Sequence, residues 1–214
     1  MTRSRSRPLE AAAPRRPYHH GNLRQALVDA TIRLVEERGV EAVSMREVAK
    51  AVGVSPGAPF RHFASRLALL TAVAEDAMDR LVEAIEEATR AVAGDDPIRH
   101  FHAIGSGFLR WAISNPTHFQ VIANRGVIDF EASSLRRRND AIQARMTALM
   151  AEAAASQRLR PGDPGLHQIA ARALVYGLAR MYVDGQFPSW NLSEKDALGA
   201  CEAILDQFIA TITV

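Results

Sequence analysis

The side chains best suited to chemistry in this 214-residue sequence lie close together, between residues 44 and 66. The set, which includes two apolar positions between the polar ones, is Ser44, Arg46, Lys50, Ser55, Gly57, Phe60, Arg61, His62 and Arg66. Arginine and lysine neutralise phosphate groups, serine hydroxyls and helix N-terminal N–H groups donate hydrogen bonds to phosphate oxygens, and arginine also pairs with guanine. This combination indicates contact with double-stranded DNA.

Charge is unevenly distributed along the chain, although the formal net charge is only +2. Residues 1–66 hold 12 Lys and Arg against 6 Asp and Glu, whereas residues 67–214 hold 14 against 18. Positive charge gathered at one end is the pattern expected for a protein that contacts phosphates. The arginines of residues 1–17 indicate a flexible basic arm, either solvated or inserted into a minor groove, and Tyr18 and His19 are expected to reach the DNA backbone.

Catalytic and metal-binding chemistry is not indicated by the sequence. It contains no nucleophile paired with a base, no phosphate-binding loop and no cluster of metal ligands. His100 and His102 are two residues apart, which on a helix directs them about 200° away from each other and prevents chelation. Cys201 has no second cysteine to pair with and is expected to be a small buried residue. We therefore expect no enzyme activity, no cofactor and no bound metal.

Two short helices and a tight turn must position the candidate DNA contacts. Ser44 is expected to cap a helix that ends at Gly53, with Glu47 completing a capping box. Gly53 can adopt the positive φ of a tight turn. Ser55 is expected to cap a second helix, whose N-terminus would point into the major groove. The spacing predicts a helix-turn-helix over residues 44–63, with a plain helical hairpin as the alternative.

The rest of the sequence also predicts helices, because no segment shows the sustained period-two alternation of a strand. We expect an all-α protein of about nine helices, near residues 22–39, 44–53, 56–63, 65–93, 97–114, 116–124, 131–158, 164–186 and 194–213. Gly, Pro and Asn-Pro pairs separate these segments. We divide the chain into a flexible basic arm (1–17), a three-helix DNA-binding domain (18–66) and a helical ligand-binding and dimerisation domain (67–214).

Residues 23–70, with the sequence LRQALVDATIRLVEERGVEAVSMREVAKAVGVSPGAPFRHFASRLALL, resemble the TetR family of transcriptional regulators. The resemblance includes the Glu-Arg-Gly that ends the first helix, the Val-Ala-Lys-Ala-Val-Gly-Val around the turn, and Phe-Arg-His-Phe, followed by Arg66. It implies a homodimer, a palindromic operator, and repression that is relieved when a ligand binds the C-terminal domain. It also implies that His62 and Arg66 contact backbone phosphates.

The second helix of the motif departs from the family pattern at two positions. Phe60 stands where the family usually has a tyrosine, so one phosphate hydrogen bond is lost. Pro59 replaces a branched aliphatic residue, and proline disfavours helical geometry at the preceding Ala58. We therefore expect this helix to begin irregularly, or effectively at Pro59. Direct readout of bases would then fall to Ser55, Arg61, the peptide backbone and the arm.

Aromatic and methionine side chains of the C-terminal domain are candidates either for core packing or for the lining of an apolar cavity. The candidates for the cavity are Phe101, Phe108, Trp111, Phe119, Met146, Met150, Tyr176 and Tyr182. The resemblance favours a cavity that binds a small apolar ligand. His102, Arg110 and His118 are candidate polar anchors for it.

Small and large apolar residues are interleaved along the last two predicted helices, a pattern typical of close helix packing. The candidates for a four-helix interface with a second copy are Leu174, Gly177, Met181, Leu198, Ile204, Leu205 and Phe208. Packing inside one subunit is the alternative.

Two alternatives to a ligand-responsive repressor stay open. A regulator controlled by a protein partner would have a solid core where the repressor has a cavity, and a small all-α enzyme would need catalytic groups that the sequence lacks. No apolar run approaches the roughly 18 residues of a membrane-spanning helix. The basic N-terminus also lacks the apolar stretch of a secretory signal, so we expect no membrane partner and a cytoplasmic location.

Overall fold

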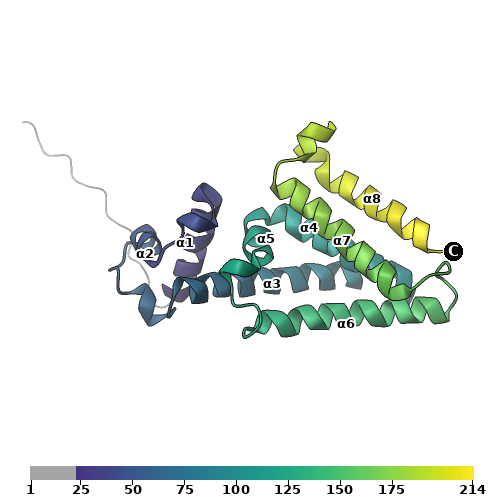
Figure 1. Ribbon diagram of the computed structural model, residues 1–214, viewed down its shortest axis with the longest axis horizontal. Coiled ribbons are helices and arrows are strands. Elements are labelled where there is room, and N and C mark those ends of the chain that lie inside the picture. Colours follow the sequence, from purple (N-terminus) through teal and green to yellow (C-terminus); the bar gives the residue numbers. More distant parts are fainter. Residues whose placement is uncertain (1–22) are drawn as a thin grey trace, which may run out of the picture.

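The computed structural model describes residues 23–214, which form eight α-helices and five short 3-10 helices (Figure 1). The α-helices are α1 Leu23–Arg38, α2 Met45–Val52, α3 Arg66–Arg90, α4 Pro97–Ser114, α5 Pro116–Ala123, α6 Ser134–Ala155, α7 Pro164–Val183 and α8 Ala197–Ile212. The all-α prediction is confirmed. Eight of the nine expected helices are present as α-helices, whereas the expected helix at residues 56–63 is reduced to a 3-10 turn. The predicted arm, Tyr18 and His19 lie outside the described residues.

The helices α1 and α2 lie together at one end of the elongated molecule (Figure 1). Leu27 of α1, Val48 of α2 and Phe63 are buried at this end. The guanidinium of Arg24 lies 5.2 Å from the centre of the Phe63 ring and covers it, which is favourable because aromatic faces attract cations. This small apolar core fixes the orientation of the turn between α2 and the following segment.

A single long helix, α3, joins that end to the rest of the molecule (Figure 1). Its first turns pack on α1, and its later turns pack on α4. The two helices approach closely at Gly107 of α4, where an added Cβ would come within 2.9 Å of the Ala84 carbonyl oxygen and 3.0 Å of the Ile85 Cα. One apolar core therefore runs from the N-terminal helices into the C-terminal bundle.

The C-terminal bundle is arranged around α4, which contacts α3, α5, α6, α7 and α8. The C-terminus is tied to the turn between α6 and α7 by a backbone bridge between Leu159 and Thr213. Within residues 23–214 there is no helix both long and apolar enough to cross a membrane.

Candidate functional site

The helix α2 begins and ends with the caps that its sequence predicts. The hydroxyl of Ser44 accepts a hydrogen bond of 3.1 Å from the backbone N–H of Glu47. Gly53 ends the helix in the left-handed region, at φ 78° and ψ 30°, where a side chain would be strained. The other half of the expected capping box is not formed in the described part of the chain, because the Glu47 carboxylate lies 3.6 Å from Arg38 of α1. That ion pair joins the first two helices instead.

The segment after the turn is a single 3-10 helix, Pro59–Arg61, preceded by a turn over residues 55–58. The prediction that it effectively begins at Pro59 is confirmed. The expected effect of the proline on Ala58 is wrong, because Ala58 is helical at φ −62° and ψ −41°. The turn holds it there through the Ala58 N–H, which donates to the Ser55 carbonyl oxygen at 2.9 Å. The prediction that the Ser55 hydroxyl caps this helix is also wrong, since Ala58 occupies the cap position and no side chain of the described residues caps it.

Most of the candidate DNA contacts in this motif are exposed to solvent. The exposed candidates are Arg46, Lys50, Ser55, Gly57, Phe60, Arg61 and His62. Pro59, between them, is buried, and Phe60 is 56% exposed although it is apolar. An exposed aromatic ring beside arginine, lysine and histidine suits contact with the sugar–phosphate backbone better than solvent.

Arg66 has a structural task that the sequence did not suggest. Its guanidinium donates to the carbonyl oxygens of Val43 at 2.8 Å and Val40 at 2.7 Å, and it lies 3.6 Å from the Glu41 carboxylate. These bonds connect the start of α3 to the loop that precedes α2. This arrangement therefore does not favour the expected phosphate contact of Arg66. Ser44 is half-buried and caps the N-terminus of α2.

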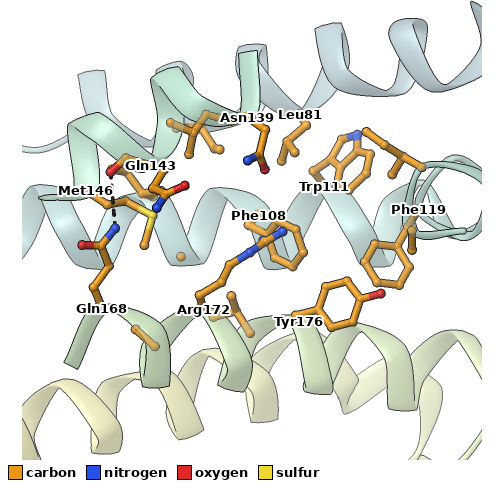
Figure 2. Close-up of a pocket in the computed structure, with 18 of the residues that line it drawn as sticks. Leu81, Phe108, Trp111, Phe119, Asn139, Gln143, Met146, Gln168, Arg172 and Tyr176 are labelled. Atoms are coloured by element: carbon orange, nitrogen blue, oxygen red, sulfur yellow. Dashed lines mark hydrogen bonds between the residues drawn. The ribbon is translucent and has the colours of Figure 1, made fainter. Parts of the chain in front are cut away.

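The C-terminal bundle contains a cavity of about 460 Å³ between α3, α4, α5, α6 and α7 (Figure 2). Six of the eight predicted lining residues border it: Phe101, Phe108, Trp111, Phe119, Met146 and Tyr176. The rings of Phe108 and Phe119 pack edge to face with centroids 6.1 Å apart, and those of Phe119 and Tyr176 are tilted with centroids 5.5 Å apart. A mostly apolar cavity of this size lies within the range of small-molecule sites.

Three residues are not where the sequence analysis expected them. Met150 is 1% exposed in the core and does not border the cavity, and Tyr182 packs on Phe187 near the end of α7. Leu205 was expected at a dimer interface, but it is 1% exposed and lines the cavity beside Gly105. On a helix with apolar residues on nearly every face, such as α8, the positions that face the core are hard to tell from those that face outward.

The three expected polar anchors also lie elsewhere. His102 and Arg110 of α4 face α8, where their side chains bond Asp206 at 2.7 Å and Glu202 at 2.7 Å respectively. His118 of α5 lies 3.4 Å from a carboxylate oxygen of Asp76 and does not border the cavity. Burial lowers the pKa of His118 below its ordinary value of 6.5, with the charge of Arg80 acting in the same direction and Asp76 opposing it.

The sequence pattern did not predict the polar side chains that do border the cavity. They are Arg125, Asn139, Gln143, Gln168 and Arg172. Arg172 and Gln168 lie four and eight residues before Tyr176, on the same stripe of α7, and this spacing was the available signal. No three His, Cys, Asp or Glu side chains within residues 23–214 gather so that they could hold a metal ion.

Comparison with known proteins identifies the family. Residues 27–73 match the bacterial regulatory proteins of the tetR family, and residues 101–208 match the tetracyclin repressor-like C-terminal domain. The chain belongs to the TetR family. The TetR match covers both the helix-turn-helix and the cavity-bearing bundle, so the two halves of the molecule belong to one known arrangement.

Individual relatives are distant. The chain is 37% identical over 70 residues to the HTH-type transcriptional regulator BetI of Rhizobium meliloti, a match that covers 33% of this chain and only 34% of that relative. A solved protein of unknown function from Rhodococcus sp. RHA1 is similar with a TM-score of 0.72 and 27% identity, over 94% of this chain and 100% of the other. The TetR family regulator PfmR of Thermus thermophilus shares the fold, with a TM-score of 0.70 and 21% identity over 88% of this chain and 96% of the other.

Proposed function

We propose that this TetR family chain is a transcriptional repressor that binds a palindromic DNA operator as a homodimer and is released by a small, mainly apolar ligand. The observation that carries the proposal is the exposure of Arg46, Lys50 and Arg61 on a helix-turn-helix whose apolar side is buried. Operator binding through these groups would place two copies of the motif in successive major grooves.

Selection of DNA from a random duplex library tests this function directly. We expect the full-length protein to enrich an inverted repeat, and its affinity for that repeat to fall steeply as salt rises, because bound phosphates release counterions. Replacing Arg46 and Lys50 together with alanine should abolish the enrichment. Replacing the exposed Arg145 of α6 with alanine is the matched control and should leave it intact. No enriched repeat, or binding that does not depend on salt, would contradict the proposal.

The second copy is proposed to pack on α7 and α8. Leu174, Gly177, Met181, Leu198 and Phe208 are half-buried in the single chain, and Ile204 is 37% exposed. An added Cβ at Gly177 would meet nothing within 4 Å, so there is open space on this face for another helix. Small residues beside large ones allow two helices to approach closely, which supports this face as the interface.

Control by a small ligand is favoured over control by a protein partner because the bundle is hollow. The 460 Å³ cavity reaches α3, the helix that also supports the DNA-binding end. A ligand that fits best when α3 is displaced would favour a dimer whose two motifs are wrongly spaced for DNA. Since the target is chromosomal DNA, we place the protein in the cytoplasm.

A further inference from the structure

The cavity is apolar but carries uncompensated positive charge. Arg125 and Arg172 are the charged residues that border it in the described part of the chain, and no aspartate or glutamate does so. Arg125 and Arg172 are exposed in the single chain, and a ligand that fills the cavity would remove water from their guanidinium groups. That removal is costly unless an anion or several hydrogen-bond acceptors of the ligand face the two cations. The lining therefore carries a net positive charge, which an anionic ligand would balance.

Arg172 is the better placed of the two. Figure 2 shows its side chain extending from α7 into the cavity, toward the ring of Phe108. The guanidinium carbon lies 4.9 Å from the centre of the Phe108 ring and 5.6 Å from that of Tyr176. It forms no ion pair within residues 23–214. Arg172 is exposed to solvent in the single chain. The protein around its side chain still desolvates the guanidinium and so lowers the pKa of Arg172, with Tyr176 opposing this effect and Arg125 adding to it.

Arg125 is the weaker candidate, because the carboxylate of Glu131 already acts on its charge, whereas no carboxylate of the described residues does so at Arg172. Its guanidinium carbon lies 3.0 Å from the centre of the Phe130 ring, so one face of the group is covered. Burial lowers the pKa of Arg125, and the charge of the nearby Glu131 partly offsets that effect. Arg125 therefore adds to the positive potential of the cavity, while Arg172 presents the accessible hydrogen-bond donors.

Neutral amide groups occupy the end of the cavity near Arg172. Gln168, one turn before Arg172, donates to the Gln143 backbone oxygen at 3.3 Å and accepts from the Thr147 hydroxyl at 3.0 Å. Asn139 and the Gln143 side chain border the cavity from α6 (Figure 2). Amides can hydrogen-bond to a ligand head group without cancelling the charge of Arg172.

We propose that the ligand is an amphipathic anion, with its apolar body among the aromatic rings and its anionic head paired with Arg172. The planar guanidinium can hold a carboxylate with two parallel hydrogen bonds, which a point charge cannot do. The same charges disfavour a permanently cationic ligand. This inference rests on the proposed ligand response, and it adds the charge class of the ligand.

Three probes with one apolar chain and different heads test the charge class: decanoate, 1-decanol and decyltrimethylammonium. The full chain has two tryptophans, of which Trp111 borders the cavity and Trp190 is 72% exposed. In a Trp190→Phe background, the fluorescence of Trp111 reports occupation of the cavity. We expect decanoate to bind about 10- to 100-fold more tightly than decanol, the gain typical of a charge-assisted hydrogen bond, and the cation to bind most weakly.

Variants of Arg172 separate the role of its charge from its role in packing. Arg172→Met should reduce decanoate affinity to that of decanol and leave decanol binding unchanged, which also reports that the cavity is intact. Arg172→Lys should restore part of the preference. Arg145→Met, an exposed arginine of α6 that does not border the cavity, is the matched control and should behave as the parent.

The possible outcomes distinguish the anionic ligand from the proposed ligand-responsive repressor on which it rests. Equal binding of decanoate and decanol, tighter binding of the cation, or an unchanged preference in Arg172→Met would overturn the anionic ligand while leaving a ligand-responsive regulator in place. If probes bind the cavity with the expected preference but none weakens binding to the selected DNA, the ligand response fails instead. If none of the three probes binds, the amphipathic anion is overturned, and the DNA selection decides separately whether the chain is an operator-binding regulator.

Discussion

Arg61 ends the short recognition segment, and its exposed side chain is the best candidate on that segment for contact with a base. If it pairs with a guanine, Arg61→Ala should weaken operator binding by roughly 1–3 kcal/mol and leave binding to scrambled DNA nearly unchanged. Fluorescence anisotropy with both duplexes at one salt concentration measures the difference. An equal loss on both duplexes would make Arg61 a phosphate contact.

His118 should make the stability of the protein sensitive to mild acid. Burial lowers the pKa of His118 from 6.5, so the unfolded chain binds this proton more readily than the folded chain does. Well above pH 6.5 both states are neutral at this site, and as the pH falls through 6.5 protonation of the unfolded chain reduces the free energy of unfolding. Wild type should therefore lose more stability between pH 7.5 and 5.5 than His118→Gln.

Urea denaturation of both proteins at the two pH values measures this difference. Equal losses would show that the proton binds equally well in both states, and a larger loss in the variant would reverse the assigned direction. The neighbouring Asp76 also accepts a hydrogen bond of 2.8 Å from Arg80. An Asp76→Asn variant therefore separates the effect of protonating His118 from the effect of the charged groups around it.

At the scale of elements, the close approach of α3 and α4 depends on a missing side chain. Gly107→Ala would place a methyl group against backbone atoms of α3, which cannot move aside as a side chain tip can. We expect a loss of about 1–3 kcal/mol in the free energy of unfolding, as for other overpacked cores. Gly199→Ala on α8, where an added Cβ meets nothing within 4 Å, should instead stabilise the helix by about 0.5–1 kcal/mol. Chemical denaturation compares the two variants. An unchanged free energy of unfolding in Gly107→Ala would show that α3 moves aside to make room for the methyl group.

The helices themselves were predictable because caps and breaks mark their ends. Asp96 accepts hydrogen bonds from the N–H groups of Ile98 and Arg99 at the start of α4, and Pro97 occupies its first turn. The recognition segment was predicted only in part. Its 3-10 form follows the buried Pro59 and the turn over residues 55–58, and the sequence alone does not show that this turn forms.

The cavity was predictable as a set of aromatic residues but not as a charged site. Periodicity identifies apolar stripes, and arginine within such a stripe is usually attributed to the solvent side. Arg172 was missed for that reason. His102 and Arg110 were assigned to the ligand because nothing in the sequence indicates that Glu202 and Asp206, about a hundred residues later, lie opposite them.

At the scale of the whole molecule, the proposed dimer can be tested without disturbing the single chain. Gly177 has open space around it, so Gly177→Glu should fold normally yet place a charge in the proposed interface. We expect wild type to sediment as a dimer at micromolar concentration and the variant as a monomer with weaker operator binding. Ala144→Glu, an exposed position on α6, is the control and should remain dimeric. A dimeric Gly177→Glu would place the interface elsewhere, and a monomeric wild type would refute the dimer.

The hydrogen bonds from Arg66 to the Val40 and Val43 carbonyl oxygens couple the DNA-binding end to α3, so that we expect the two to move as one rigid body. The helix has 25 residues, or about 37 Å of length, and Met78, Leu81 and Ile85 along it border the cavity. A rigid rod of that length acts as a lever arm: a tilt of about 5° at its far end moves the near end by about 3 Å, from the same helix geometry. A ligand therefore need only wedge the bundle slightly apart to carry the recognition segment out of register with its groove.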